Sequence, residues 1–108
     1  MNCFEKEQST FRIGDVVKHF KYETLTEVEK ASNKYLYVIR AFATQTETKE
    51  ELVIYQALYG EFDTYARPLE MFAAEVDRDK YPNIRQKYKF EKVYWGPMAM
   101  QMPKRERY

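Results

Sequence analysis

Two stretches of the chain decide its fold: residues 35–43, which read YLYVIRAFA, and residues 52–59, which read LVIYQALY. Both are rich in the β-branched and aromatic residues that favour strands. Both are also apolar on the two faces that a strand presents, as in the central strands of a small barrel. The segment between them, TQTETKEE at 44–51, is polar and typical of a hairpin loop. The sequence therefore predicts two central antiparallel strands joined by this loop.

The chain before these strands predicts one further strand and one helical turn. A turn at 14–15, Gly-Asp, leads into a strand over 16–20. Thr24 and Thr26 are each followed three residues later by a Glu, which is the spacing of a capping box. A short helix is expected from one of these two residues, ending at Asn33.

The chain after the central strands predicts another strand and a second helical turn. Gly60 ends the second central strand, and a short strand over 62–66 is expected to finish at Arg67-Pro68. Pro68 fits the first position of a helix, where its missing N–H costs nothing. About two turns are expected, because one helix face collects the apolar residues Leu69, Phe72, Ala73 and Val76.

Residues 84–90 alternate between two kinds of side chain. Arg85, Lys87, Lys89 and Glu91 fall on the polar side, and the other side collects Ile84, Gln86, Tyr88 and Phe90. A period of two favours a strand, although a helix that begins at Pro82 stays open for the first half. Together the elements predict a mainly β fold, a small and strongly bent antiparallel barrel with one or two short helical turns.

Length and composition indicate one domain. The chain has 108 residues, 44% of them hydrophobic, which is too apolar for a disordered protein. We expect a mobile arm at 1–12 that Phe4 or Phe11 anchors, a domain at 13–95, and a loose, Met-rich basic tail at 96–108. The single Cys, Cys3, excludes an internal disulfide framework. No segment has the length of a membrane span, so a cytoplasmic protein is expected.

Charge is unevenly distributed along the chain although the formal net charge is only +1. Residues 44–79 hold three Lys/Arg and nine Asp/Glu, whereas residues 80–108 hold eight Lys/Arg and two Asp/Glu. Such asymmetry can mark a nucleic-acid surface. It also arises when the two segments neutralise each other in one domain. A total near zero favours the second interpretation, because nucleic-acid-binding domains are usually clearly basic.

Several blocks of the chain resemble a family of small bacterial proteins, the domain of unknown function 1653. The blocks are VKHFK (17–21), KYLY (34–37), ELVIYQALYG (51–60), ARPLEMF (66–72) and KYP (80–82). The resemblance covers roughly residues 13 to 93. It implies a compact β-barrel of the SH3-like kind and no established activity.

Two loop residues depart from the pattern of that family. Gln45 stands where members often carry His, so a titrating role of that His is absent here. Lys49 stands where members often carry Gly. If this position has a left-handed backbone, Lys should cost about 1 kcal/mol relative to Gly.

An enzymatic reading depends on His19, the single His of the chain. It could form an acid–base pair with Glu47 or Glu70. No nucleophile elbow and no Cys/His pair accompany it. The alternative is a structural, half-buried His with a backbone partner, and this alternative is favoured.

The sequence predicts no metal or cofactor site. The acidic residues of the hairpin loop and its surroundings lack the fixed spacing of a calcium loop, and one His and one Cys far apart do not make a zinc site. Neither a Walker A segment nor a Rossmann glycine pattern is present. No cofactor is therefore expected.

Arg67 is the most ligand-like residue of the chain. It stands where a strand ends and a helical turn begins, with Glu70 one turn later and with Tyr55 and Tyr59 on the preceding strand. A guanidinium beside free backbone N–H groups can bind an anion. The structural alternative is an ion pair between Arg67 and a carboxylate of the acidic segment.

The basic C-terminal third carries the hypothesis of nucleic-acid binding. Its candidates are Arg85, Lys87, Lys89, Tyr94 and Trp95, because cations beside exposed aromatic rings make stacking platforms. Strand alternation, however, places the rings of residues 84–90 in the core and the charges in water. Only Tyr94 and Trp95 are then expected to be free to stack.

We expect a non-enzymatic binding module that offers a Tyr/Arg-lined groove to a peptide or a small anionic ligand. Binding of RNA or single-stranded DNA is one alternative, and a small enzyme that uses His19 with a Glu is another. The partner itself is not predicted, no membrane is expected, and an uncovered edge strand could pair with a second copy of the chain.

Overall fold

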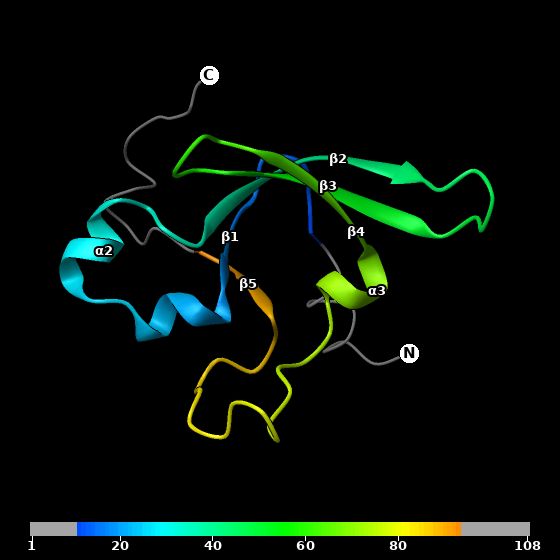
Figure 1. Ribbon diagram of the computed structural model, residues 1–108. Coiled ribbons are helices and arrows are strands. Elements are labelled where there is room, and N and C mark those ends of the chain that lie inside the picture. Colours follow the sequence, from blue (N-terminus) through cyan, green and yellow to red (C-terminus); the bar gives the residue numbers. More distant parts are fainter. Residues whose placement is uncertain (1–10, 94–108) are drawn as a thin grey trace.

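The computed structural model describes residues 11–93, whose arrangement is drawn in Figure 1. Three short helical segments occur in this range: the 3-10 helix η1 (Phe20–Thr24), α2 (Glu27–Ala31) and α3 (Leu69–Phe72). The strands are β1 (Val16–His19), β2 (Leu36–Thr44), β3 (Glu51–Ala57), β4 (Thr64–Pro68) and β5 (Phe90–Lys92). The expectations for Cys3, for Phe4 and for the tail at 96–108 lie outside the described residues. No helix within 11–93 is long and apolar enough to cross a membrane.

The five strands form one antiparallel sheet in the order β4-β3-β2-β1-β5. The prediction of a mainly β fold with β2 and β3 at its centre is confirmed. The predicted barrel is not, because within residues 11–93 strand β4 pairs only with β3 and β5 only with β1. The sheet is therefore open within residues 11–93. The SH3-like arrangement stays a prediction.

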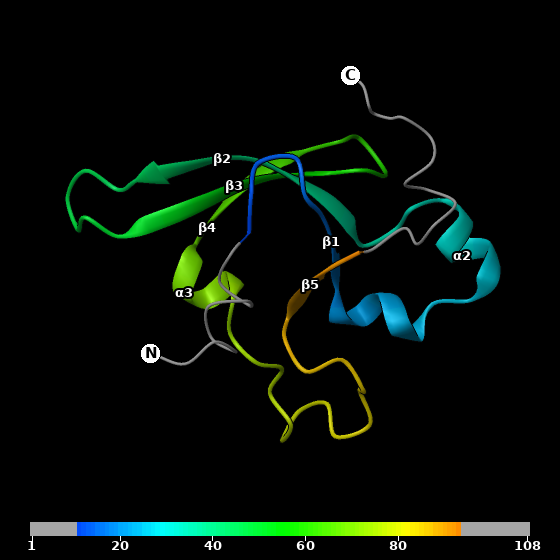
Figure 2. The same ribbon diagram turned by 180° about the vertical axis from the view of Figure 1, so that it is seen from behind.

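A β-bulge bends the sheet. Ile39 pairs with Tyr55 and Ala41 with Ile54, so Arg40 is an extra residue on β2. A bulge increases the local twist and bends its strand. Beyond it, the β2–β3 hairpin projects from the body of the protein, while β1 and β5 run at a steep angle to it (Figures 1 and 2). The inner half of the sheet thereby curves around the core.

Two local features of the sequence are recovered, one in helix α2 and one in the loop between β2 and β3. The hydroxyl of Thr26 accepts a hydrogen bond from the Glu29 N–H, and the Glu29 carboxylate accepts one from the Thr26 N–H. This is the predicted capping box, in the second of its two possible positions. In the loop between β2 and β3, Lys49 has a φ of 67°. This position does require a left-handed backbone, which favours Gly.

The core is dominated by aromatic rings on the concave side of the sheet. The rings of Phe72 and Phe90 stack at 4.3 Å between centroids, and both side chains are fully buried. Phe11 packs edge-on against Phe72 at 5.2 Å. Of the two Phe residues predicted to anchor the N-terminal arm, Phe11 is thus a core residue. Helix α3 and strand β5 are held together by this stack.

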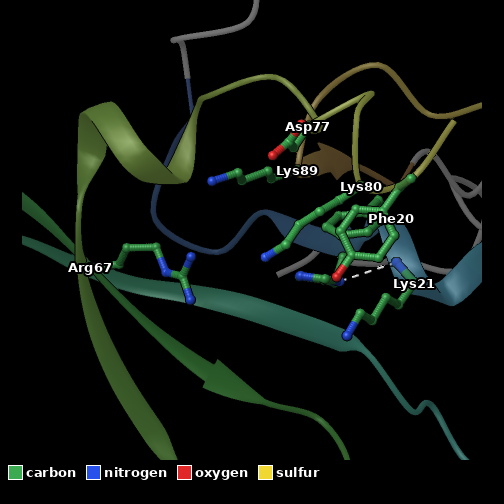
Figure 3. A pocket seen from close by; sticks show the side chains of 8 residues that line it. Phe20, Lys21, Arg67, Asp77, Lys80 and Lys89 are labelled. Atoms are coloured by element: carbon green, nitrogen blue, oxygen red, sulfur yellow. Dashed lines mark hydrogen bonds between the residues drawn. The ribbon is translucent and has the colours of Figure 1, made fainter. Parts of the chain in front are cut away.

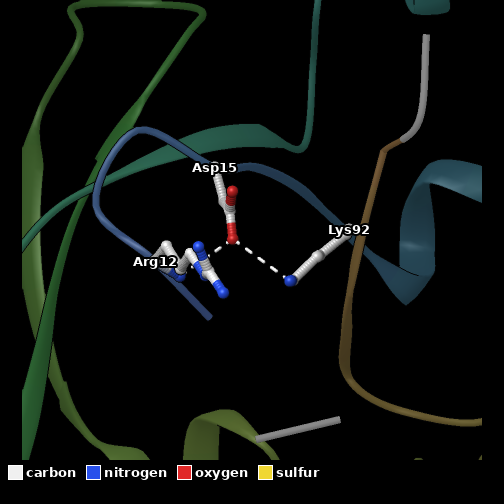
Figure 4. A network of polar contacts seen from close by, with 3 residues as sticks. All are labelled: Arg12, Asp15 and Lys92. Atoms are coloured by element: carbon white, nitrogen blue, oxygen red, sulfur yellow. Dashed lines mark hydrogen bonds and ion pairs between the residues drawn. The ribbon is translucent and has the colours of Figure 1, made fainter. Parts of the chain in front are cut away.

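An ionic contact ties the start of β1 to β5. The Asp15 carboxylate accepts a hydrogen bond from the Arg12 N–H at 2.8 Å, and the same oxygen lies 3.4 Å from the Lys92 Nζ (Figure 4). This is the one ion pair among residues 11–93. The segments at 44–79 and 80–108, one acidic and one basic, are not joined by an ion pair in the part that the structure describes.

The segment from 73 to 89 differs most from its predicted form. Helix α3 ends at Phe72, one turn earlier than expected, and β5 begins only at Phe90. The alternation itself is observed: Gln86 is buried while Arg85 and Lys87 are exposed. The alternative of a helix from Pro82 is wrong, because residues 82–89 contain no helix.

Side chains supply hydrogen bonds to the backbone of residues 84–86 in this segment. The Glu23 carboxylate accepts hydrogen bonds from the Arg85 and Gln86 N–H groups, at 2.7 and 3.0 Å. The Arg78 guanidinium donates to the carbonyl oxygens of Ile84 and Gln86. Backbone groups outside a strand ladder still need partners. Carboxylate and guanidinium groups supply them at residues 84–86, and a single antiparallel bridge joins Glu75 to Tyr88. The result is an irregular loop that places Lys80 and Lys89 beside the sheet.

Candidate functional site

Two adjoining hollows lie on the concave side of the sheet and share His19, Lys21 and Arg67. The first, which we call the cationic hollow, has a volume of about 270 Å³ and is also lined by Phe20, Asp77, Lys80, Tyr81 and Lys89. The second, which we call the tyrosine hollow, has a volume of about 250 Å³ and is also lined by Tyr35, Tyr37, Tyr55, Tyr65 and Phe90.

Arg67 stands between the two hollows. It lies near the end of β4 and is half-buried. Its Nε–H donates to the Tyr55 hydroxyl at 3.2 Å, and its guanidinium carbon lies 5.6 Å from the centre of the Phe90 ring. No carboxylate of residues 11–93 lies within ion-pair distance of it, and its two Nη groups have no hydrogen-bond acceptor there. The structural alternative, an ion pair with the acidic segment, is therefore not observed within 11–93.

His19 ends β1 on the opposite side of the shared region. Its Nδ1 accepts a hydrogen bond from the Lys21 N–H at 3.1 Å, and its ring stacks on Phe20 at 4.3 Å. Burial, followed by the positive charges of Lys21, Arg67 and Lys89, lowers the pKa of His19 to about 4. The imidazole is thus neutral at pH 7. Because Nδ1 accepts a hydrogen bond, the proton of the neutral ring is on Nε2, which is a hydrogen-bond donor.

Positive charge dominates the cationic hollow. Figure 3 shows Lys80 and Lys89 extending toward Arg67 from the opposite side, with Lys21 below them. The one carboxylate of the lining belongs to Asp77, and one of its oxygens accepts a hydrogen bond from the Asp79 N–H. Four cationic side chains around one carboxylate make a site that attracts anions.

Aromatic rings from three adjacent strands form the tyrosine hollow. Tyr37 on β2, Tyr55 on β3 and Tyr65 on β4 lie with ring centroids 5.4 to 6.4 Å apart. The hydroxyls of Tyr37 and Tyr59 are hydrogen-bonded at 3.0 Å. Burial, together with this hydrogen bond, raises the pKa of Tyr37 far above its usual value, so the phenol stays protonated. Four tyrosine rings and the ring of Phe90 line the hollow, and its positive charges are those of Lys21 and Arg67, which it shares with the cationic hollow.

Tyr35 occupies a strained backbone position at the edge of the tyrosine hollow. Its φ is 68°, a left-handed value that a bulky residue rarely adopts. Its ring lies 5.7 Å from His19 and 6.1 Å from Tyr59. Strain of this kind is often found at binding sites, where the surrounding structure holds a side chain in place.

Of the six residues predicted as ligand-binding candidates, the structure brings His19, Tyr55 and Arg67 together. Tyr59 lies behind them and contacts the site through Tyr37. The two predicted carboxylates are elsewhere: Glu47 is in the β2–β3 loop and Glu70 is exposed on α3, and neither lines the hollows that contain His19. The pairs that the enzymatic hypothesis requires are thus not formed.

Of the three described residues predicted to bind nucleic acid, one lines the cationic hollow and two do not. Lys89 was expected in water, yet it is half-buried and lines the cationic hollow. Arg85 and Lys87 are exposed outside it, and Tyr94 and Trp95 lie outside the described residues.

Sequence analysis missed several lining residues: Lys21, Tyr35, Tyr37, Tyr65, Asp77, Lys80 and Tyr81. Lys21 could have been predicted from the sequence, because it follows His19 by two residues at the end of a predicted strand. The others converge only through long-range packing. Within residues 11–93 the structure contains no cluster of three or more His, Cys, Asp or Glu that could hold a metal ion.

Comparison with known proteins gives one match. A family model described as "Protein of unknown function (DUF1653)" matches residues 15–92, which include all residues of both hollows. No curated protein matches the chain. No solved structure matches it either.

Proposed function

The chain belongs to the DUF1653 family, whose function is unknown, and we propose that it binds a small anionic ligand between His19 and Arg67. The proposal rests on the side chains of this chain, because the family assigns no activity. The ligand would occupy the region that the two hollows share. The proposal thus replaces the general expectation of a Tyr/Arg-lined groove with a specific site around His19, Lys21 and Arg67. Binding, rather than catalysis, is the proposed role.

The observation that carries this proposal is the state of Arg67. Its guanidinium is half-buried and oriented by Tyr55 and Phe90, yet within residues 11–93 it lacks a carboxylate partner. A charge in such a position is costly unless it is paired. An anion that accepts hydrogen bonds from the two Nη groups would supply the missing partner, and the planar guanidinium suits a carboxylate or a phosphate.

The neighbours of Arg67 support an anion in the same place. The Nε2–H of the neutral His19 is a donor, and Lys21 adds a positive charge at the same boundary. Among the described residues, His19 has no hydrogen bond to a carboxylate, and its pKa of about 4 makes it a weak base at neutral pH. General acid–base catalysis favours a pKa near the working pH, so these residues fit a binding site better than a catalytic one.

Isothermal titration calorimetry with pyrophosphate tests the proposal. We expect saturable binding to the wild-type protein that weakens as salt is added. Arg67→Met keeps the apolar stem and removes the charge. It should lower the affinity by about 10-fold or more, since a hydrogen bond to a charged group contributes roughly 1.5–3 kcal/mol.

Arg40→Met is the matched control, because Arg40 is exposed at the bulge of β2 and lines neither hollow. It should bind like the wild type. Lys21→Met provides a second site variant if Arg67→Met does not fold. Equal affinities in the wild type, Lys21→Met and Arg67→Met, or no binding at all, would contradict the proposal. Binding of an acidic peptide instead of pyrophosphate would redirect it to the peptide alternative.

A further inference from the structure

We propose that the anionic ligand is a nucleoside phosphate, with its phosphate in the cationic hollow and its base in the tyrosine hollow. This inference rests on the anion site proposed above and names its ligand class. It follows from the different chemistry of two hollows that share three residues.

The dimensions favour one ligand that spans both hollows. Each hollow, at about 270 and about 250 Å³, is smaller than the roughly 300–1,000 Å³ of typical small-molecule pockets. Because His19, Lys21 and Arg67 belong to both, a ligand bound to these residues reaches into either side. A molecule with two chemically different ends therefore fits the site better than a simple anion.

The cationic hollow suits a phosphate group. The side chains that meet there are Arg67 from β4, Lys21 from the chain after β1, and Lys80 and Lys89 from the loop before β5. A phosphate has several acceptor oxygens and more negative charge than a carboxylate, so it can use donors that come from several directions. The carboxylate of Asp77 faces the same space, and the surplus of cations outweighs it.

The tyrosine hollow offers aromatic side chains against which a flat ring can pack. Tyr37 and Tyr55 are buried, and their hydroxyls are engaged with Tyr59 and Arg67. Tyr65, on the outer strand β4, is 43% exposed. Tyr35 is half-buried at the other side, next to His19. Such surfaces accept a base by stacking, whatever its identity.

A sugar phosphate fits less well. Its hydroxyl groups need several acceptors, whereas the two hollows offer one carboxylate, and the Tyr37 hydroxyl is already bonded to Tyr59 outside the lining. A planar heteroaromatic group attached to a phosphate offers an anion to the cationic hollow and a flat ring to the tyrosine hollow.

Calorimetry with four probes tests the inference: pyrophosphate, inorganic phosphate, adenosine 5′-monophosphate and adenosine. We expect the monophosphate to bind roughly 5- to 150-fold more tightly than inorganic phosphate, which is the contribution of one stacked base. Adenosine alone should bind more weakly than the monophosphate, because it lacks the charged end.

Two variants separate the base from the phosphate. Tyr65→Ala should remove the preference for the monophosphate and leave the affinity for inorganic phosphate unchanged. Arg67→Met should weaken both. Phe62→Ala is the matched control, because Phe62 is an exposed aromatic residue of the same hairpin that does not line the hollow. It should behave like the wild type.

The phosphate could belong to a free nucleotide or to the end of a nucleic acid. A short oligonucleotide with and without a 5′-phosphate distinguishes the two sources. Tighter binding of the phosphorylated oligonucleotide than of the monophosphate supports the inference with a nucleic-acid end as the source, and tighter binding of the monophosphate supports it with a free nucleotide. Equal binding of both oligonucleotides, with the monophosphate binding no more tightly than inorganic phosphate, overturns it.

The remaining outcomes distinguish this inference from the proposal beneath it. If pyrophosphate and inorganic phosphate bind at Arg67 but the monophosphate binds no more tightly than inorganic phosphate, the nucleoside part is wrong and the anion site stands. If neither pyrophosphate nor any phosphate binds, both fail.

Discussion

The protonation of His19 gives a prediction that needs no ligand. Its pKa is expected to be about 4 in the folded protein, compared with 6.5 in the unfolded chain. The unfolded state therefore binds a proton as the pH falls below 6.5, while the folded state does not until about pH 4. Stability is constant above pH 6.5 with respect to this group, decreases as the pH falls from 6.5 to 4, and is constant again below that.

The difference between the two pKa values sets the size of the effect. It corresponds to at most about 3.5 kcal/mol, because the pKa falls from 6.5 to about 4 and one pKa unit is about 1.4 kcal/mol. His19 is only half-buried, so solvent screening reduces the effect, and we expect about 1–2 kcal/mol. The loss should be absent in His19→Gln, which cannot titrate.

Nuclear magnetic resonance measures this pKa without ambiguity, since the chain contains a single His. The Cε1–H signal of His19 is followed with pH while the amide spectrum remains that of the folded protein. A pKa near 4 is expected, and saturation with pyrophosphate should raise it, because the bound anion offsets the charges of Lys21 and Arg67. A pKa of 6.5 or higher in the ligand-free protein would refute the assignment of His19 to a buried, cation-lined site.

Three further predictions concern stability. Lys49→Gly should raise the free energy of unfolding by about 1 kcal/mol, because it relieves a left-handed φ, whereas Lys49→Ala should give no such gain; urea denaturation compares the two. Phe72→Ala should lower the free energy of unfolding by about 3–5 kcal/mol, since it empties a fully buried position stacked on Phe90, and a smaller loss in the same assay would mean that the core closes over the gap. Burial raises the pKa of Glu23, but hydrogen bonds from the N–H groups of Arg85 and Gln86 outweigh it and hold that pKa below 4.5. The stabilisation by ionised Glu23 is therefore present above pH 4.5 and lost as the pH falls through the lowered value, so Glu23→Gln should reduce the melting temperature at pH 7 but not in acid, and equal reductions at both pH values would contradict this.

Local signals in the sequence predicted the elements that depend on few residues. The capping box at Thr26 and the two central strands are of this kind, since their hydrogen bonds and apolar faces follow from adjacent residues. The length of α3 and the form of residues 84–90 were not predictable in this way. In that segment the side chains of Glu23 and Arg78, which lie elsewhere in the sequence, form hydrogen bonds with the backbone. The alternation of residues 84–90 contains no sign of these two partners.

The barrel was predicted from the number of strands and from the family resemblance, and neither determines closure. Closure requires the outer strands to meet, but β5 is short and pairs only with β1 in the described part of the chain. In the candidate site, too, residues placed by local structure were predicted and residues placed by long-range packing were not. Arg67 was predicted from its place between a strand and a helical turn, with Tyr55 on the preceding strand, and β3 and β4 do pair. Lys80 and Lys89 reach the hollow only through the fold of the loop before β5.

The central claim is that an anion occupies the region between His19 and Arg67. A titration of the ¹⁵N-labelled protein with pyrophosphate, followed by two-dimensional nuclear magnetic resonance, tests it most directly. We predict that the Arg67 Nε–H signal and the amides of Lys21 and Lys89 shift together and saturate, while the amide of Arg40 stays in place. Saturable shifts elsewhere, with the signals of Arg67 and Lys21 unchanged, would contradict the claim.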